Sequence, residues 1–199
     1  MKNKARFYQR LGAYLVDILV IMLIASVVTT PFIDMKSLDQ LDSESTELIQ
    51  KLQAGEISIK TYYTEAMSIS YQMAKVQGLT TLVALFLNVL YYIVFQFYND
   101  GQTLGKKLFR IRVTGYKNKK LNINNYIYRS LIINSLLLDM IVFALIIFGN
   151  STDYFYGYLV IELMDYLLLL VSSIMTIFRR DGRGLHDLLA GTSVVRVEV

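Results

Sequence analysis

The chain of 199 residues contains no cysteine and only one histidine, His186. The lack of cysteine excludes disulfides, a thiol nucleophile and thiolate metal sites. A single histidine leaves no multi-histidine metal site, so we expect no metal and no cofactor. The G-x-S-x-G and H-E-x-x-H motifs are absent, and the glycines of 101–107 are too closely spaced for a Walker A phosphate loop. We therefore expect that the protein is not an enzyme.

Charge is scarce as well, since only 18% of the residues are charged while 54% are hydrophobic. Four long runs are almost free of charge, and they span 11–33, 76–98, 128–148 and 155–178. A bilayer core of about 30 Å requires about 20 apolar residues of helix, and each run approaches or exceeds that length. The sequence therefore predicts an all-α integral membrane protein with four transmembrane helices and a single domain over 1–199.

The charges of the connecting segments are unevenly distributed. Of the 20 Lys and Arg residues, 16 lie in 1–10, 99–129 or the tail 179–199, whereas 34–75 carries seven acids and four lysines. By the positive-inside rule, both termini and the loop 99–127 face the cytoplasm, and the acidic segment is external. The basic excess then reflects topology in the cell membrane, where the partner is the lipid bilayer and no nucleic acid is bound.

The external segment 34–75 carries its own helical patterns. Ser43 and Ser45 precede an amphipathic stretch at 47–52, which predicts a short helix. From Ser58 onward, apolar residues recur at helical spacing up to the second apolar run. We therefore predict a short external helical cap over the outer ends of the bundle.

Three short cytoplasmic stretches have the composition of strands. Polar and apolar residues alternate at 110–113, β-branched residues gather at 192–197, and 120–123 follows a turn. We predict that these pieces pair as a small cytoplasmic β element.

Four acids fall inside the predicted membrane helices: Asp17, Asp139, Glu162 and Asp165. Ionised carboxylates are costly in a bilayer, and no lysine or arginine lies in the central turns of any helix to pair with them. Glu162 and Asp165 are three residues apart and share a helix face, where they can share one proton or hold one cation. The four are candidate ion- or proton-binding residues; the alternative is that they form hydrogen bonds which hold the helices together.

Asp17 and one further acid, Asp187 in the tail, need partners. Arg10 lies two helical turns before Asp17, too far along the axis for direct pairing, so we expect a donor from another helix or from the tail at Asp17. In the tail, we expect Asp187 to bond the backbone or a cationic cluster.

Three separate stretches resemble the RDD family of bacterial membrane proteins. They are RLGAYLVD at 10–17, GQTLGKK at 101–107 followed by RIRV at 110–113, and GLHDLLAGT at 184–192. The resemblance implies that Arg10, Asp17 and Asp187 are the arginine and the two aspartates for which the family is named. It also implies a membrane role, with transport of an unidentified ligand as the general expectation and sodium/proton exchange for some members.

Two functions remain open at this point. The first is ion- or proton-coupled transport of an unidentified ligand, in which the four membrane acids bind a small cation or proton. Because four helices enclose little space, this function favours a homo-oligomer. The second is a non-enzymatic protein partner or regulatory subunit that acts through the external segment or the basic cytoplasmic face. The 42 residues of 34–75 exceed what a minimal transporter needs, which favours the second function.

Overall fold

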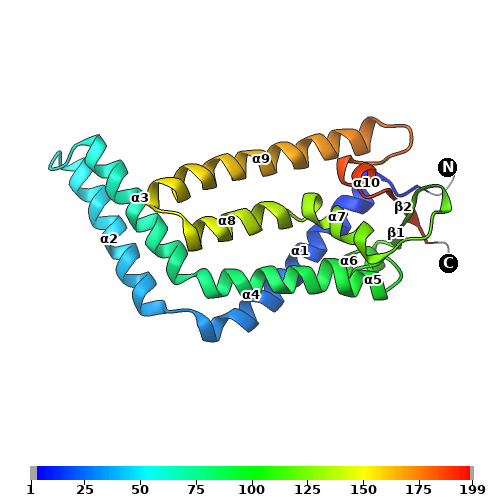
Figure 1. The fold of residues 1–199 in the computed structure, drawn as a ribbon, viewed down its shortest axis with the longest axis horizontal. Coiled ribbons are helices and arrows are strands. Elements are labelled where there is room, and N and C mark those ends of the chain that lie inside the picture. The colour runs from blue at the N-terminus through cyan, green and yellow to red at the C-terminus, as the bar shows by residue number, and fades with distance from the viewer. Residues whose placement is uncertain (1–3, 198–199) are drawn as a thin grey trace.

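The computed structural model describes residues 4–197 of the chain. Long helices run along one axis, a helical hairpin lies across one end, and a two-stranded sheet lies at the other (Figure 1). We refer to these as the cap end and the sheet end. The elements in chain order are α1 (Phe7–Thr29), η1 (Thr30–Phe32), α2 (Met35–Gln53), α3 (Ile59–Val76), α4 (Gly78–Val89), the π-helical η2 (Leu90–Phe95), α5 (Gln96–Tyr98), α6 (Leu104–Leu108), β1 (Ile111–Gly115), η3 (Tyr116–Asn118), α7 (Ile123–Ile133), α8 (Leu136–Phe148), α9 (Ser151–Phe178), α10 (Leu185–Leu189) and β2 (Thr192–Arg196).

Three helical stretches are long and apolar enough to cross a membrane, namely Phe7–Phe32, Gly78–Tyr98 and Ser151–Phe178. Many of their large apolar side chains face outward; Leu23 and Val27 of α1 are 68% and 75% exposed. Surfaces this apolar are stable in lipid rather than in water. Three of the four predicted runs therefore form helices of membrane-spanning length.

The fourth predicted run, 128–148, is not one straight helix. α7 ends at Ile133, α8 begins at Leu136, and the two axes differ by 67°. Ser135 between them has φ of 54°, a left-handed conformation that interrupts the ladder of helical hydrogen bonds. The single helix predicted here is wrong, and the structure has three candidate spans, or four if the bent pair crosses as one.

The polar segment after α1 folds as a hairpin of two helices, α2 and α3 (Figure 1). Asp34 caps α2, so the helix start predicted at 43–45 is wrong by about two turns. Ser58 caps α3 through its side-chain oxygen. Near the other end of α3, the Tyr71 hydroxyl donates to the carbonyl of Gly149 at 2.5 Å, which ties the hairpin to the turn between α8 and α9.

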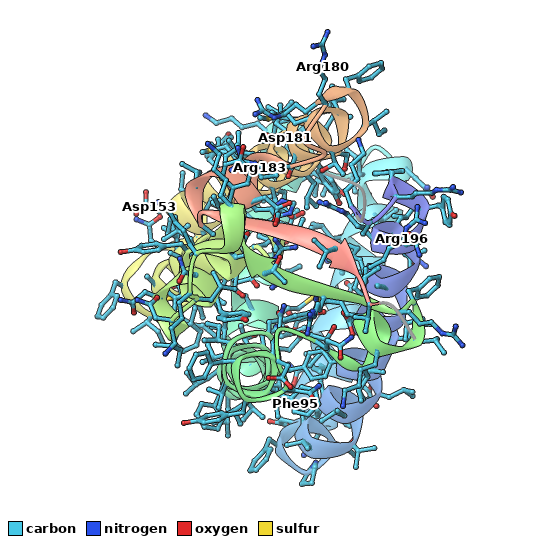
Figure 2. All side chains as sticks on the ribbon, turned by 90° about the vertical axis from the view of Figure 1, so that its right-hand side faces the viewer. Phe95, Asp153, Arg180, Asp181, Arg183 and Arg196 are labelled. Atoms are coloured by element: carbon cyan, nitrogen blue, oxygen red, sulfur yellow. The ribbon has the colours of Figure 1, made fainter. Side chains whose placement is uncertain are left out.

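At the sheet end, β1 and β2 pair in antiparallel fashion. Lys4 forms a bridge with Val195, so both ends of the described chain lie here. The third strand predicted at 120–123 is wrong, because Asn122 caps α7 there instead. Figure 2 looks onto this end and shows arginines around the sheet, among them Arg180, Arg183 and Arg196.

The short helix α6 packs directly on α1 at the sheet end. A Cβ atom at Gly105 would collide with the backbone carbonyl oxygen of Ala13 and lie 2.8 Å from Asp17 Oδ1. Ala13 itself is buried within the cluster of apolar residues that supports this end. The absence of a side chain at Gly105 therefore sets the distance between the loop and the first helix.

We predict that Gly105→Ala lowers the free energy of unfolding by about 1–3 kcal/mol, because the added methyl group meets backbone that has little room to move. The measurement is thermal unfolding of the detergent-purified protein. Gly78→Ala is the control, since a Cβ there lies 3.9 Å from its nearest neighbour, Ile146. Equal stability of the two variants would contradict the close packing of α6 on α1.

Candidate functional site

Two buried carboxylates organise the sheet end. Asp17 of α1 is 1% exposed and Asp187 of α10 is 0% exposed. A buried carboxylate is stable only where hydrogen bonds and positive charges replace its water. Asp17 lies near the start of the chain and Asp187 near its end. The partners of each residue show which segments of the chain it joins.

Asp17 accepts hydrogen bonds from three groups. The Tyr91 hydroxyl donates to Oδ1 at 2.7 Å, the Gly105 amide donates to the same oxygen at 2.8 Å, and the Thr103 hydroxyl donates to Oδ2 at 2.5 Å. The Lys106 ammonium lies 3.5 Å from Oδ2. Tyr91 belongs to the π-helical segment η2, a local widening of the helix that is frequent at functional sites. Asp17 thus fastens α1 to both η2 and the loop that carries α6.

Asp187 lies between two guanidinium groups. Arg10 of α1 donates to Oδ2 at 2.8 Å, and Arg129 of α7 donates to Oδ1. The Thr192 hydroxyl donates to Oδ1 at 2.9 Å. Burial opposes the ionised form, but the positive charge of Arg129 and Arg10 outweighs it and holds the pKa of Asp187 well below its usual range. Asp187 is therefore an anion that joins the tail to α1 and α7.

The only histidine of the chain lies beside this ion pair. His186 Nδ1 lies 2.6 Å from the Ser172 hydroxyl of α9, and Nε2 lies 3.5 Å from Asp187 Oδ2. Burial lowers the pKa of His186 to about 3, and nearby Arg129 acts in the same direction. At neutral pH the ring is therefore uncharged, and it fills the space between α9 and α10.

A cavity of about 170 Å³ lies against both carboxylate clusters. Its charged lining comprises Arg10, Lys106 and Arg129, and His186 lines it as well. Two tyrosines, Tyr14 and Tyr92, together with uncharged polar side chains and apolar side chains of α1, α7 and α9, complete the wall. Burial lowers the pKa of Lys106 to about 8, although Asp17 acts against that shift. Because its charged lining is positive, the cavity is able to hold a small anion.

The remaining predicted acids lie on α8 and α9, in a second cluster. The charges of Glu162 and Asp165 both act on Asp139. The Ser135 hydroxyl, at the break before α8, donates to Asp165 Oδ1. Within residues 4–197, no hydrogen bond or ion pair joins Asp17 to these three, and no group of three or more His, Cys, Asp or Glu side chains is arranged to hold a metal ion.

Several residues of the site carried no recognisable pattern in the sequence. Arg129 resembles an ordinary charge at the end of an apolar run, and Tyr91 and Ser172 resemble ordinary helix residues. Lys106 and the adjacent Lys107 are alike in the sequence, although Lys107 is exposed and only Lys106 lies at the site. The one available clue to Arg129 is that it is an arginine among apolar residues, which requires a buried partner.

The chain matches the RDD family over residues 4–191. It therefore belongs to the RDD family. No match was found among curated proteins or among solved structures. With three or four helices of spanning length, this RDD protein is a membrane protein. The residues matched to the family by resemblance, Arg10, Asp17 and Asp187, are those that bind the loop and the tail to α1.

We predict that acid weakens the sheet end through His186. Between pH 6.5 and about 3 the unfolded chain binds a proton at His186 that the folded chain does not bind. The free energy of unfolding therefore falls as the pH is lowered through this window, by about 1.4 kcal/mol per pH unit at most. Thermal unfolding of the purified protein between pH 7 and pH 4.5 measures the slope.

The matched variant is His186→Gln, which cannot titrate but keeps a polar side chain. It should lose a large part of the acid dependence above pH 4.5, where Asp187 remains ionised in both states. An unchanged slope in this variant would contradict a neutral, buried His186.

Proposed function

We propose that this RDD protein is an ion- or proton-coupled transporter whose coupling site is the cluster of Asp139, Glu162 and Asp165. The sheet end faces the cytoplasm in this proposal, because the basic residues gather there. The family resemblance implies a transported ligand without identifying it. In this proposal, two or more copies of the chain form the pathway.

The observation that carries the proposal is the juxtaposition of three acids on α8 and α9 without a cation. Asp139 lies on α8, which packs against α9, the helix that carries Glu162 and Asp165. No lysine or arginine in the described part of the chain forms an ion pair with any of the three. Like charges in a low dielectric are relieved by taking up a proton. The break at Ser135 supports this role, since irregular backbone at membrane depth is tolerated where it lines a site.

Asp17 differs from the other three acids. Its oxygens already accept from Tyr91, Thr103 and Gly105, and Lys106 supplies positive charge nearby. A carboxylate satisfied in this way has little need of a transported ion. We therefore assign Asp17 a structural role, which is to anchor the loop that carries α6. The coupling role belongs to the acids of α8 and α9.

The test is ion flux in proteoliposomes that contain the purified protein. We expect proton flux above that of empty vesicles, and we expect the triple variant Asp139→Asn, Glu162→Gln, Asp165→Asn to reduce it to the empty level. These amides keep the shapes of the side chains and remove only their charge and protons. Glu56→Gln, an exposed change in the α2–α3 turn, is the control and should retain flux. Full flux in the triple variant, or no flux in the native protein, would refute the proposal.

A second function has its own supporting observation at the cap end. The α2–α3 hairpin extends across the ends of the long helices, and Ile59 and Tyr63 on it are 68% and 53% exposed (Figure 1). Apolar side chains at such a position suit a protein partner. If the protein instead co-purifies from native membranes with a stoichiometric companion that Ile59→Ser, Tyr63→Ser removes, and shows no flux, the role of partner subunit replaces transport.

A further inference from the structure

The cavity at the sheet end has an excess of positive charge. Arg10, Lys106 and Arg129 line it, and no Asp or Glu is present among its described lining residues. The two carboxylates nearby lie behind these cations, Asp187 against the arginines and Asp17 against the lysine. Three cations against two anions leave one positive charge, since His186 is neutral at physiological pH. A site of low dielectric stabilises such a charge only with a counter-ion.

The hydrogen bonds of the cluster also leave one donor unused. Arg10 Nε is buried and has no hydrogen-bond partner, one of two such side-chain atoms in the described chain, the other being Arg196 Nε. Most buried polar atoms in proteins are paired, so an unpaired guanidinium nitrogen on a residue that lines a cavity indicates a missing acceptor. The arginine, rather than its carboxylate partner, is the group left unsatisfied.

Lys106 shows the same shortage of negative charge. Its side chain is 13% exposed, its ammonium lies 3.5 Å from Asp17 Oδ2, and burial still lowers its pKa. The nearest carboxylate is therefore not close enough to offset the loss of water. An anion inside the cavity would supply the charge that Lys106 lacks.

The apolar part of the cavity wall indicates what kind of ligand would fit. Leu11 of α1 and Leu169 of α9 line the cavity on the side of the long helices, and Leu11 is 43% exposed on the outer surface. The wall therefore continues from the cations toward the lipid-facing surface of α1. An anion with an apolar portion satisfies both parts of the cavity.

We propose that the cavity at the sheet end binds a phosphate-bearing group, held by Arg10, Lys106 and Arg129. Arginine forks and a lysine point charge are well suited to phosphate oxygens. The group comes either from an anionic phospholipid of the same leaflet or from a soluble phosphate compound. The site is distinct from the acids of α8 and α9, and the proposal does not depend on ion transport.

The test uses delipidated protein in a non-ionic detergent, titrated separately with phosphatidylglycerol, phosphatidylcholine and inorganic phosphate. The readout is the ligand-induced rise in the thermal midpoint of unfolding, converted to an apparent Kd. We expect phosphatidylglycerol or inorganic phosphate to bind, with affinity that falls at high salt. Lys106→Gln should weaken binding about tenfold through loss of a charge-assisted contact, while Lys107→Gln on the adjacent exposed position leaves it unchanged.

A second pair of variants tests the cavity without altering its charge. Ser173 lines the cavity, so Ser173→Phe should fill it and abolish binding, whereas Leu170→Phe, at a 55% exposed position of the same helix, should not.

Binding of phosphatidylglycerol alone assigns the lipid source, and binding of inorganic phosphate assigns the soluble source; either result supports the site when these variants behave as stated. The proposal would be overturned if phosphatidylcholine bound as well as phosphatidylglycerol, or if neither phosphatidylglycerol nor inorganic phosphate bound. It would also be overturned if the two variants of a pair had equal effects.

Discussion

The arrangement of the sheet end depends on the buried charge of Asp187 between Arg10 and Arg129. Each arginine comes from a different helix, and the carboxylate comes from the tail. One group therefore joins three segments that are far apart in the sequence. The loss of one partner from a buried ion pair costs about 3–5 kcal/mol, because the remaining charge has neither water nor a counter-ion. This contact holds the tail, which continues into β2, against α1 and α7.

Asp17 performs a corresponding role for the loop before β1. It holds Thr103 and Gly105 against α1, and Gly105 permits the close approach of the backbone. The two carboxylates together fix the walls of the cavity but do not neutralise all the cations that line it. The same interactions that stabilise the sheet end thus leave it with an unmatched positive charge, which is the basis for assigning it an anionic ligand.

Local patterns in the sequence were sufficient for part of this structure. The apolar runs predicted three helices of spanning length, and the motif residues Arg10, Asp17 and Asp187 all lie at buried contacts of the sheet end. The break near Ser135 was not predictable from hydropathy, since apolar residues flank it directly at 131–133 and 136–138. Arg129 was not predictable either, because its partner Asp187 is 58 positions away and only the fold brings the two together. Tertiary contacts of this kind leave no periodic trace in the sequence.

The most direct test of this account is a double-mutant cycle on the central ion pair. The free energy of unfolding is measured in detergent for the native protein, Arg129→Gln, Asp187→Asn and the double variant. The account predicts strong coupling, about 1.5–3 kcal/mol, so that the double variant is far less destabilised than the sum of the single variants. Additivity within about 0.5 kcal/mol would show that the two residues do not interact, and would contradict the role assigned to Asp187.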